Sequence, residues 1–308
     1  MKTATAGSPV CSAASLPPRH ETVDLSRRTS FGIGGEAAEF YAPGSVEELT
    51  ALARTLRDET LRDEGRRPHV LGGGCNTLFP DGAFHRPVLS TERLTGLSIE
   101  GDQVWCGAGV RIEVLLRETT SAGLAGMEFF AGIPGSAGGA IAMNAGGSGH
   151  SFGDHVTRLE GVSLETGEYE ELPADRVAWS YRSANLGAFL VTGVRFRLLR
   201  EDARVVRERA VEFLRKKAQH QPLQHLSAGC IFKNSPDAPA ARLIDRAGLK
   251  GTRVGGAVVS ERHANFIVNE TRTATARDVL ELVALVRKRV LDLYSVDLQT
   301  EIVVPSNS

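Results

Sequence analysis

The sequence predicts a protein that mixes helices and strands, in two domains or in one large domain. Its 308 residues exceed the roughly 100–200 residues of one average domain. Of these residues, 42% are hydrophobic and 24% are charged, which is typical of a soluble globular protein. No apolar run reaches membrane-spanning length, and the N-terminus lacks the apolar segment of a secretory signal. We therefore expect a cytoplasmic protein whose core needs no disulfide scaffold.

The charge and cysteine content exclude several classes of function. The 36 Lys and Arg residues balance 37 Asp and Glu residues, so a broad nucleic-acid surface is not expected. Cys11, Cys75, Cys106 and Cys230 lie far apart and form no CxxC pair, so neither a zinc nor an iron–sulfur site is predicted. Glycine accounts for 33 residues, more than the average share of about 7%. The backbone must therefore turn tightly in many places or approach a ligand closely.

After a loose tail over residues 1–20, the pattern predicts an N-terminal domain over residues 21–200. Ser45 and Glu48 form a capping box, which predicts that a helix begins there. The short apolar run that ends at Leu71 is typical of a buried strand. The other elements expected in this domain are strands over Ala38–Ala42, Pro87–Ser90, Gln103–Cys106 and residues 188–199, a hairpin turn at Thr166–Gly167, and a helix over Ile112–Thr120.

A charged amphipathic helix over Asp202–Gln219 interrupts the β pattern, and Pro222 closes it. We therefore place the domain boundary near Arg200 and expect a C-terminal domain over residues 201–308. This domain should contain β segments, a helix near Ala276–Tyr294 and a final strand over Val296–Val304.

Two glycine-rich segments of the N-terminal domain are candidates for binding a phosphate-bearing ligand. LGGGCN (Leu71–Asn76) follows a strand and presents successive backbone N–H groups, and GIPGSAGG (Gly132–Gly139) repeats this arrangement. One such loop is usually only a turn, but two in one half of the chain favour a ligand the size of a dinucleotide. Gly32-x-Gly34 is not flanked by a strand and a helix start, so we do not expect a Rossmann site there.

Three side chains in the second half of the chain are candidates for chemistry. Cys230 lies among small residues in SAGCIFKN, and Lys233 and Asn234 follow it as candidates for holding an anionic substrate. Arg182 lies among polar residues in WSYRSAN, and Glu301 interrupts an apolar strand. Each also has an ordinary explanation: a buried cysteine, a solvent-exposed arginine, and a carboxylate at a sheet edge.

Several motifs follow one another in an order and at a spacing that one enzyme family shares. They are TSFGIGG (Thr29–Gly35), LGGGCN, the segment Gly123–Gly147, YRSAN, SAGCIFKN, LIDRAGLKG (Leu243–Gly251), HANFIVN (His263–Asn269) and the late Glu301. On these motifs the chain resembles the UDP-N-acetylenolpyruvoylglucosamine reductases from about residue 22 to residue 304, in the subtype without an extra substrate-covering loop. Cys75, Thr77, Ser235 and the segment near Ser148 depart from the usual family pattern.

The resemblance implies an α+β fold, with an FAD-binding domain of the vanillyl-alcohol-oxidase or PCMH type and a smaller C-terminal α+β substrate domain. It implies the activity of UDP-N-acetylmuramate dehydrogenase, in which FAD and NADPH reduce UDP-N-acetylglucosamine enolpyruvate to UDP-N-acetylmuramate for peptidoglycan synthesis. The implied partners are this small-molecule substrate and NADPH, with no nucleic acid, membrane or metal. A monomer or a weak oligomer is expected.

The resemblance also implies roles for single residues. Arg182 and Glu301 match catalytic residues of the family, and Cys230 occupies the place of a proton donor that is serine in many relatives. Tyr181, Lys233 and Asn234 are the expected substrate contacts. The expected cofactor contacts are Gly72, Gly73, Gly74, Cys75, Asn76, Thr77, Gly132, Ile133, Pro134, Gly135, Gly138, Gly139, Ala140, Asn144, Ala145 and Gly146.

Two other functions remain as alternatives from the sequence. A different FAD oxidoreductase on the same fold would bind flavin but would not select the UDP-sugar. A binding or scaffold protein that has lost catalysis would be favoured by the loss of Arg182, Cys230 or Glu301, and the sequence keeps all three.

Overall fold

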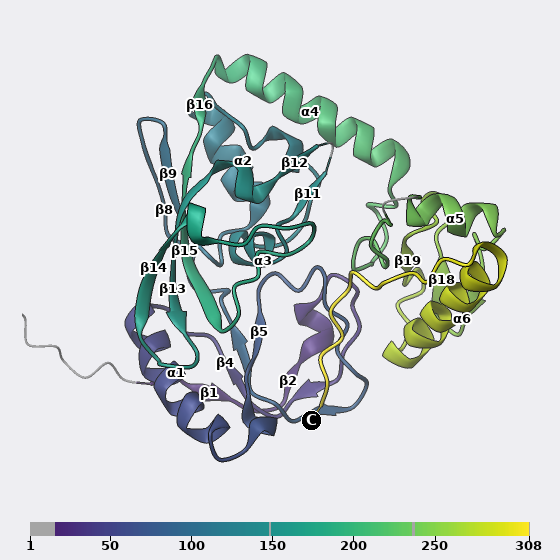
Figure 1. Ribbon diagram of the computed structural model, residues 1–308, viewed down its shortest axis with the longest axis horizontal. Coiled ribbons are helices and arrows are strands. Elements are labelled where there is room, and N and C mark those ends of the chain that lie inside the picture. The colour runs from purple at the N-terminus through teal and green to yellow at the C-terminus, as the bar shows by residue number, and fades with distance from the viewer. Residues whose placement is uncertain (1–15, 148, 236–237, 308) are drawn as a thin grey trace, which may run out of the picture.

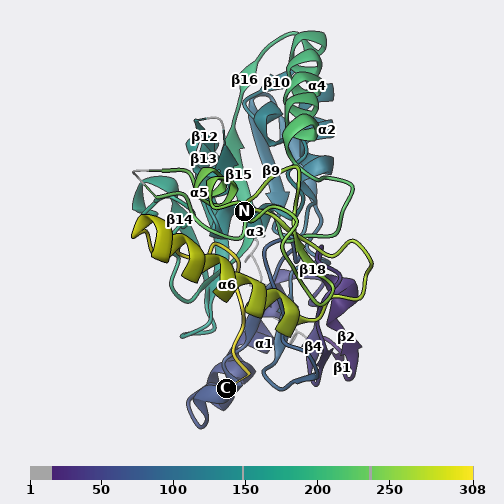
Figure 2. The same ribbon diagram turned by 90° about the vertical axis from the view of Figure 1, so that its right-hand side faces the viewer.

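The protein consists of a larger N-terminal part and a smaller C-terminal part, joined by the long helix α4 (Ala203–His220) (Figure 1). The structure is a computed structural model that describes residues 16–147, 149–235 and 238–307. Figure 2 shows the molecule from the side of the C-terminal part, with α6 (Ala276–Tyr294) crossing the front below α4. Among the described helices, none is both long and apolar enough to cross a membrane.

Two small sheets form the first half of the N-terminal part. The four-stranded sheet has the order β1-β4-β7-β5, in which β7 runs parallel to both β4 and β5. The LGGGCN motif directly follows β5, so it lies at the carboxyl end of a parallel pair. The strands of the two sheets are β1 (Arg19–His20), β4 (Phe40–Tyr41), β7 (Val88–Ser90) and β5 (His69–Leu71), and β2 (Val23–Asp24), β3 (Glu36–Ala37) and β6 (Ala83–Phe84).

A five-stranded antiparallel sheet of order β14-β13-β15-β9-β8 forms the second half. Residues Leu190–Val194 of the central strand β15 are buried without alternation, so both faces of the sheet are covered there. The strands are β8 (Leu97–Glu100), β9 (Gln103–Gly107), β13 (Val156–Ser163), β14 (Tyr169–Pro173) and β15 (Phe189–Arg197), with the short pairs β10 (Leu124–Ala125) and β16 (Leu199–Arg200), and β11 (Gly146–Gly147) and β12 (His150–Ser151).

The expected helices form where their sequence signals lie. Oγ of Ser45 accepts a hydrogen bond from the N–H of Glu48 over 3.2 Å, and the helix follows from residue 46. The carboxylate of Glu48 accepts from the N–H of Gly44 over 2.8 Å, one residue beyond the usual capping-box partner. The helices of this part are α1 (Val46–Thr60), α2 (Ile112–Ser121) and α3 (Ala137–Ala142), with 3-10 turns at Leu25–Arg28, Glu64–Arg66, Glu128–Phe130, Phe152–His155 and Ala174–Arg176.

The C-terminal part shares its core with the N-terminal part. Buried residues of α6 recur at helical spacing, as at Val279, Leu282, Val283 and Val286, and pack in one cluster that also contains Phe31, Ile33 and Leu78. The elements of this part are α5 (Ala240–Arg246), α6, and a three-stranded sheet of β17 (Arg253–Val254), β18 (Ala257–Val259) and β19 (Ile267–Val268).

The prediction of a continuous strand over Val296–Val304 is wrong. This segment is extended, but it forms only isolated bridges, antiparallel between Phe232 and Thr300 and parallel between Thr77 and Val303. The segment meets a different partner on each side, so no continuous ladder can form. At the other end of the chain, Arg19 and His20 pair with β4, and residues 1–15 of the expected tail lie outside the described residues.

Candidate functional site

Arg182, Glu301 and Cys230 form one cluster although they belong to three distant segments. Nε of Arg182 donates to Oε1 of Glu301 over 2.7 Å, and only 20% and 13% of their side-chain surfaces are exposed. The N–H of Glu301 donates to the carbonyl of Ile231 over 2.8 Å, which places Glu301 beside the cysteine segment. Glu301 and Arg182 both influence the pKa of the Cys230 thiol, in opposite directions. The fold therefore brings together the three residues predicted to be catalytic.

Burial controls the protonation of this cluster. Burial, with a smaller contribution from Glu301 and against the opposing charge of Arg182, raises the pKa of Cys230 to about 12, so the thiol is protonated at neutral pH. Burial also raises the pKa of Glu301, although the neighbouring cations Arg182 and Lys233 oppose the change. Both acids are therefore biased toward the forms that carry a proton.

A tight loop holds Arg182 in a left-handed backbone conformation, with φ of +59°. The N–H of Ser180 donates to the carbonyl of Ser183 over 2.8 Å and closes the loop. Nδ2 of Asn144 donates to the carbonyl of Ser180 over 3.0 Å, and its Oδ1 accepts from the N–H of Gly153 over 3.1 Å. Asn144, expected to contact a cofactor, therefore also supports the loop that carries Arg182.

The cysteine segment is open on one side and anchored on the other. Gly229 has a φ of +77°, and a Cβ built there meets no atom within 4 Å, so the backbone beside Cys230 faces open space. On the anchored side, Cys230 forms an isolated bridge with Phe266. Asn265 accepts from the N–H of Phe232 over 3.0 Å and donates to its carbonyl over 2.8 Å. Sequence reasoning assigned no role to Asn265, although it lies within the HANFIVN motif.

The three expected substrate contacts surround this cluster. The Tyr181 hydroxyl accepts from the N–H of Asn234 over 3.4 Å, and its side chain is exposed. Oδ1 of Asn234 accepts from the N–H of Ala240 over 3.0 Å. The charge of Lys233 lowers the pKa of Glu301, so the ammonium lies close enough to influence the site.

The two glycine-rich segments pack against each other as one double loop, made of residues 72–76 and 132–139. The N–H of Gly73 donates to Oγ of Ser136 over 3.1 Å. A Cβ on Gly73 would lie 2.7 Å from Cα of Gly135, and one on Gly72 would lie 2.8 Å from Oγ of Ser136. At these positions the chain itself requires glycine, because another segment of backbone or side chain fills the space.

Two other glycines of the double loop leave room for a Cβ within the chain. A Cβ on Gly139 would have Oγ of Ser136 as its nearest neighbour at 3.5 Å, and Gly139 lies in α3 with ordinary helical backbone. At Gly135 the φ of +123° favours glycine, yet a Cβ would come no closer than 3.8 Å to Cys75. Contacts within the chain do not explain the glycine at 139, so it leaves room for a group from outside the chain.

A cavity of about 420 Å³ opens beside the double loop. Its volume lies within the range of roughly 300–1,000 Å³ that is usual for small-molecule sites. Gly72, Gly138 and Gly139 line one side, and the segment from Ser183 to Val191 lines much of the rest. Sequence reasoning missed the role of this segment beyond Asn185, because its residues carry no motif of their own.

Several other residues expected to contact a cofactor, within the double loop or close to it in sequence, contact other parts of the chain. A Cβ on Gly74 would lie 1.9 Å from the carbonyl oxygen of Arg28, and one on Gly132 would lie 3.0 Å from Leu214. The side chain of Asn76 donates to the carbonyl of Glu301 over 3.0 Å. Contact with a cofactor stays a prediction for these residues and for Cys75, Thr77, Ile133, Pro134, Ala140, Ala145 and Gly146.

Comparisons with known proteins assign the family. A family model described as "UDP-N-acetylenolpyruvoylglucosamine reductase, C-terminal domain" matches residues 221–305, and one described as "FAD binding domain" matches residues 37–172. The UDP-N-acetylenolpyruvoylglucosamine reductase of Moorella thermoacetica is 38% identical over 281 residues, which cover 91% of each chain. That of Desulfosudis oleivorans is 39% identical over 299 residues, covering 91% of this chain and 92% of the relative. The chain belongs to the UDP-N-acetylenolpyruvoylglucosamine reductase family.

A solved structure of this reductase family supports the same assignment. The UDP-N-acetylenolpyruvylglucosamine reductase from Thermus caldophilus matches 94% of this chain and 100% of its own, with a TM-score of 0.79 and 34% identity. The expected α+β fold, an FAD-binding domain of the PCMH type with the family C-terminal domain, is thereby confirmed.

The double loop fits the FAD that this reductase family uses. A pyrophosphate needs backbone that approaches closely without side-chain cover. Gly135 and Gly139 provide such backbone, and Gly139 has no other structural reason to be glycine. The residues that would hold FAD are therefore those of the double loop and of the cavity beside it.

Proposed function

We propose that this chain reduces UDP-N-acetylglucosamine enolpyruvate to UDP-N-acetylmuramate, with FAD as bound cofactor and NADPH as hydride donor, in peptidoglycan precursor synthesis. The observation that carries the proposal is the cluster of Arg182, Glu301 and Cys230, joined to the double loop by Asn76. This cluster supplies a cation, a carboxyl group and a thiol. Those groups suit the reduction of an enolpyruvyl group, which needs charge stabilisation at its carboxylate and a proton at carbon.

Arg182 is proposed to stabilise the charge that develops on the substrate carboxylate. Bound FAD would supply the chemistry of hydride transfer between NADPH and the enolpyruvyl group. The carboxylate then gains negative charge in the transition state, and a buried guanidinium stabilises such charge strongly. The bond to Glu301 holds Arg182 in one orientation. In its protonated form, Glu301 donates a hydrogen bond to the same substrate carboxylate.

Cys230 is proposed to donate the proton that the second carbon of the enolpyruvyl group requires. Its raised pKa keeps the thiol protonated at neutral pH, which is the state a proton donor needs. Glu301 raises that pKa and Arg182 lowers it, so the charge state of the pair affects the ease of proton release. The open space at Gly229 leaves access to the thiol from that side.

The remaining substrate and FAD contacts are proposed from where their residues lie in the structure. Tyr181, Lys233 and Asn234 lie around the catalytic cluster and are proposed to bind the substrate. The sixteen residues expected to contact FAD are proposed to do so mainly through their backbone, because eight of them are glycine and few offer a polar side chain. Residues 201–308 are proposed as the substrate-binding domain and residues 21–200 as the FAD-binding domain, which also contributes Tyr181 and Arg182 to the substrate site.

We also infer the subtype without the extra substrate-covering loop. Only β15, β16 and α4 lie between the loop that carries Arg182 and the segment that carries Cys230. A cytoplasmic monomer or weak oligomer is the state expected for an enzyme that uses NADPH and keeps free thiols such as Cys75 and Cys106.

Purified protein tests this function directly. The expected result is a yellow protein that oxidises NADPH rapidly only when UDP-N-acetylglucosamine enolpyruvate is present and forms UDP-N-acetylmuramate. A yellow protein that oxidises NADPH equally well without the UDP-sugar would be a different flavin oxidoreductase. A protein that binds the UDP-sugar but no flavin would be a binding or scaffold protein.

A further inference from the structure

The main-chain and side-chain atoms of Glu301 are held from three directions. Its N–H donates to the carbonyl of Ile231, and its carboxylate accepts from Arg182. Its own carbonyl accepts from Nδ2 of Asn76 over 3.0 Å. Asn76 belongs to the double loop, so the amide bond connects the cofactor-binding loop to the catalytic carboxyl group. Figure 1 shows the late segment, in yellow, passing from the C-terminal part back along the N-terminal part.

The Asn76 side chain faces the Glu301 segment and α3. Nδ2 also lies 3.5 Å from Sδ of Met143, the residue that caps α3. The backbone of Asn76 supports the same segment, because its carbonyl accepts from the N–H of Val303 over 2.8 Å. Both the side chain and the main chain of Asn76 are thus used to hold residues 301–303.

The chemistry of this contact requires an amide. Its NH₂ group donates to a carbonyl oxygen, whereas a carboxylate at the same place accepts only and would repel that oxygen. Alanine would leave the carbonyl of Glu301 without this donor. The late segment forms only isolated bridges on each side, so it has no ladder of hydrogen bonds to compensate.

We propose that Asn76 is a positioning residue for Glu301: its side-chain amide sets the backbone at residue 301 and thereby the orientation of the carboxyl group toward Arg182. The proposal rests on the function proposed above. It assigns to the Asn76 side chain a role separate from cofactor binding, which the backbone of the same loop provides.

Three variants test this role in the FAD-loaded enzyme. In Asn76→Ala and Asn76→Asp, flavin content and flavin reduction by NADPH should stay close to wild type. Reoxidation of the reduced flavin by UDP-N-acetylglucosamine enolpyruvate should slow by roughly 10- to 100-fold, because small displacements of a catalytic group are costly. The matched control is Asn269→Ala, which removes another inter-segment amide, the one that donates to the carbonyl of Phe31 over 3.2 Å. It should leave reoxidation unchanged.

A double variant decides whether Asn76 acts through Glu301. In the Glu301→Gln background, Asn76→Ala should slow reoxidation no further, because the positioned group is already lost. A full additional slowing would overturn the proposal. So would loss of flavin from Asn76→Ala with both half-reactions slowed, since that result would make the side chain a cofactor ligand.

Hydrogen exchange in the apoprotein tests the role of Asn76 separately from the proposed function, because it needs neither cofactor nor substrate. In the apoprotein, hydrogen exchange of residues 299–305 should be faster in Asn76→Ala than in wild type, and unchanged in Asn269→Ala. Unchanged exchange in Asn76→Ala would overturn the positioning role. If wild-type reduced flavin were not reoxidised by the UDP-sugar, the proposed function would fail, while hydrogen exchange would still decide the role of Asn76.

Discussion

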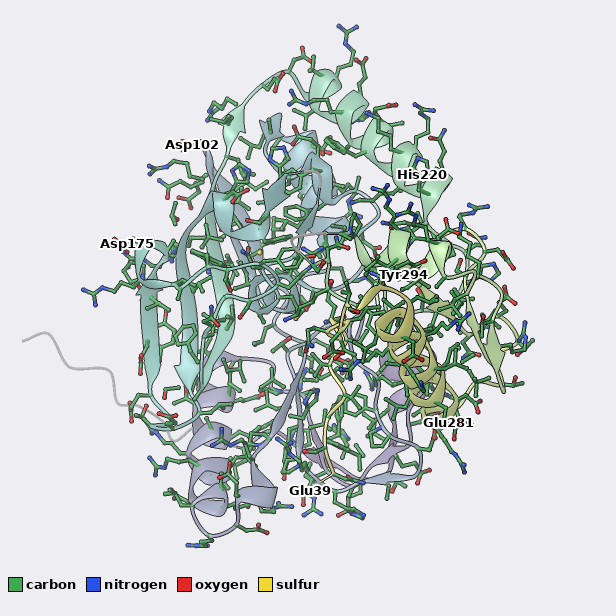
Figure 3. The ribbon with its side chains drawn as sticks, turned by 45° about the vertical axis from the view of Figure 1, so that its right-hand side comes forward. Glu39, Asp102, Asp175, His220, Glu281 and Tyr294 are labelled. Atoms are coloured by element: carbon green, nitrogen blue, oxygen red, sulfur yellow. The ribbon has the colours of Figure 1, made fainter. Side chains whose placement is uncertain are left out.

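Nε of Arg182 and Oε1 of Glu301 lie 2.7 Å apart although 119 positions separate them in sequence. The pair joins a loop of the N-terminal part to the segment that follows α6. Figure 3 labels Tyr294, the residue at which α6 ends. Both side chains are mostly buried, so the loss of one partner leaves the other with an uncompensated polar or charged group.

Glu301→Gln keeps the shape of the side chain and its ability to accept from Arg182, but removes the ionisable proton. Reoxidation of reduced flavin by the substrate should slow by about 100-fold, within the range for a positioned acid. In wild type the active form is protonated, so this rate should fall as pH rises through the raised pKa of Glu301. Stopped-flow absorbance across pH measures both effects. The same decline in Glu301→Gln would show that another group titrates, and Glu171→Gln, at an exposed pair with Arg158, is the control.

The raised pKa of Glu301 also predicts a pH dependence of stability. Between the usual pKa of 4.5 and the raised value, the folded protein binds a proton more tightly than the unfolded chain. The contribution of this carboxyl group to the free energy of unfolding therefore decreases as pH rises through that window. Melting temperatures of wild type and Glu301→Gln, measured from pH 4.5 upward, should diverge in favour of the variant. Parallel curves would contradict the raised pKa.

Cys230→Ala should leave flavin reduction by NADPH nearly intact, because that step needs no proton from the thiol. Substrate-dependent reoxidation should fall strongly, whereas Cys230→Ser should keep substantial turnover, because a hydroxyl can also donate a proton. The two half-reactions are followed separately by stopped-flow absorbance. The proton-donor role is wrong if Cys230→Ala slows both half-reactions equally, or neither.

Gly139→Ala tests the space that the double loop leaves open. The added methyl group meets no close atom of the chain, and alanine is the better helix former by about 1 kcal/mol, so the apoprotein should be at least as stable. FAD binding should weaken by roughly 10-fold, which corresponds to about 1.4 kcal/mol. Gly135→Val should lose both FAD and stability, because its φ of +123° disfavours a branched side chain. Titration of apoprotein with FAD measures the affinity, and an unchanged affinity in Gly139→Ala would make this loop only a turn.

Lys217→Met should destabilise the junction between α4 and the segment around the 3-10 turn Glu128–Phe130. Nζ of Lys217 donates to the carbonyls of Phe129 and Ala131, each over 2.8 Å, and burial lowers the pKa of Lys217 to about 8. Removing this donor should lower the free energy of unfolding by about 1–3 kcal/mol, the cost of buried carbonyls without partners. The folded state binds fewer protons than the unfolded chain between about pH 8 and the usual pKa of 10.5, so wild-type stability from this group rises with pH there.

Lys216, the neighbour of Lys217 in α4, provides the control for Lys217→Met. Lys216 is 62% exposed and pairs with Glu212 on the surface, so Lys216→Met should change stability by less than about 0.5 kcal/mol. Chemical denaturation of the two variants at several pH values separates a buried donor from a surface charge. Equal effects of the two changes would argue against the buried role of Lys217.

The elements with strong local signals were predictable from the sequence. The cap at Ser45, the amphipathic helix that became α6 and the turn at Gly167 each depend on residues close in the chain. The form of the segment Val296–Val304 was not predictable, because it depends on partners more than 60 residues away, such as Phe232 and Thr77.

The residues proposed as catalytic were identified through motifs, but the residues that support them were not. Arg182, Cys230 and Glu301 belong to recognisable segments, but nothing local shows that Asn265 anchors the cysteine segment or that Asn76 turns toward Glu301. The segment from Ser183 to Val191 lines a cavity only because β15 brings it beside α3. Such contacts are properties of the tertiary fold, which spacing along the chain does not reveal.

The shared core limits how modular this enzyme is. Phe31, Ile33 and Leu78 come from the N-terminal part but pack within the cluster that α6 covers. A chimera that takes everything after Arg200 from another family member would therefore be cut through this core, not between two independent units. Chimeras that also take residues 31, 33 and 78 from the donor of the C-terminal part should be soluble more often than chimeras that exchange only the residues after Arg200. For this enzyme, the unit that can be exchanged is discontinuous in sequence.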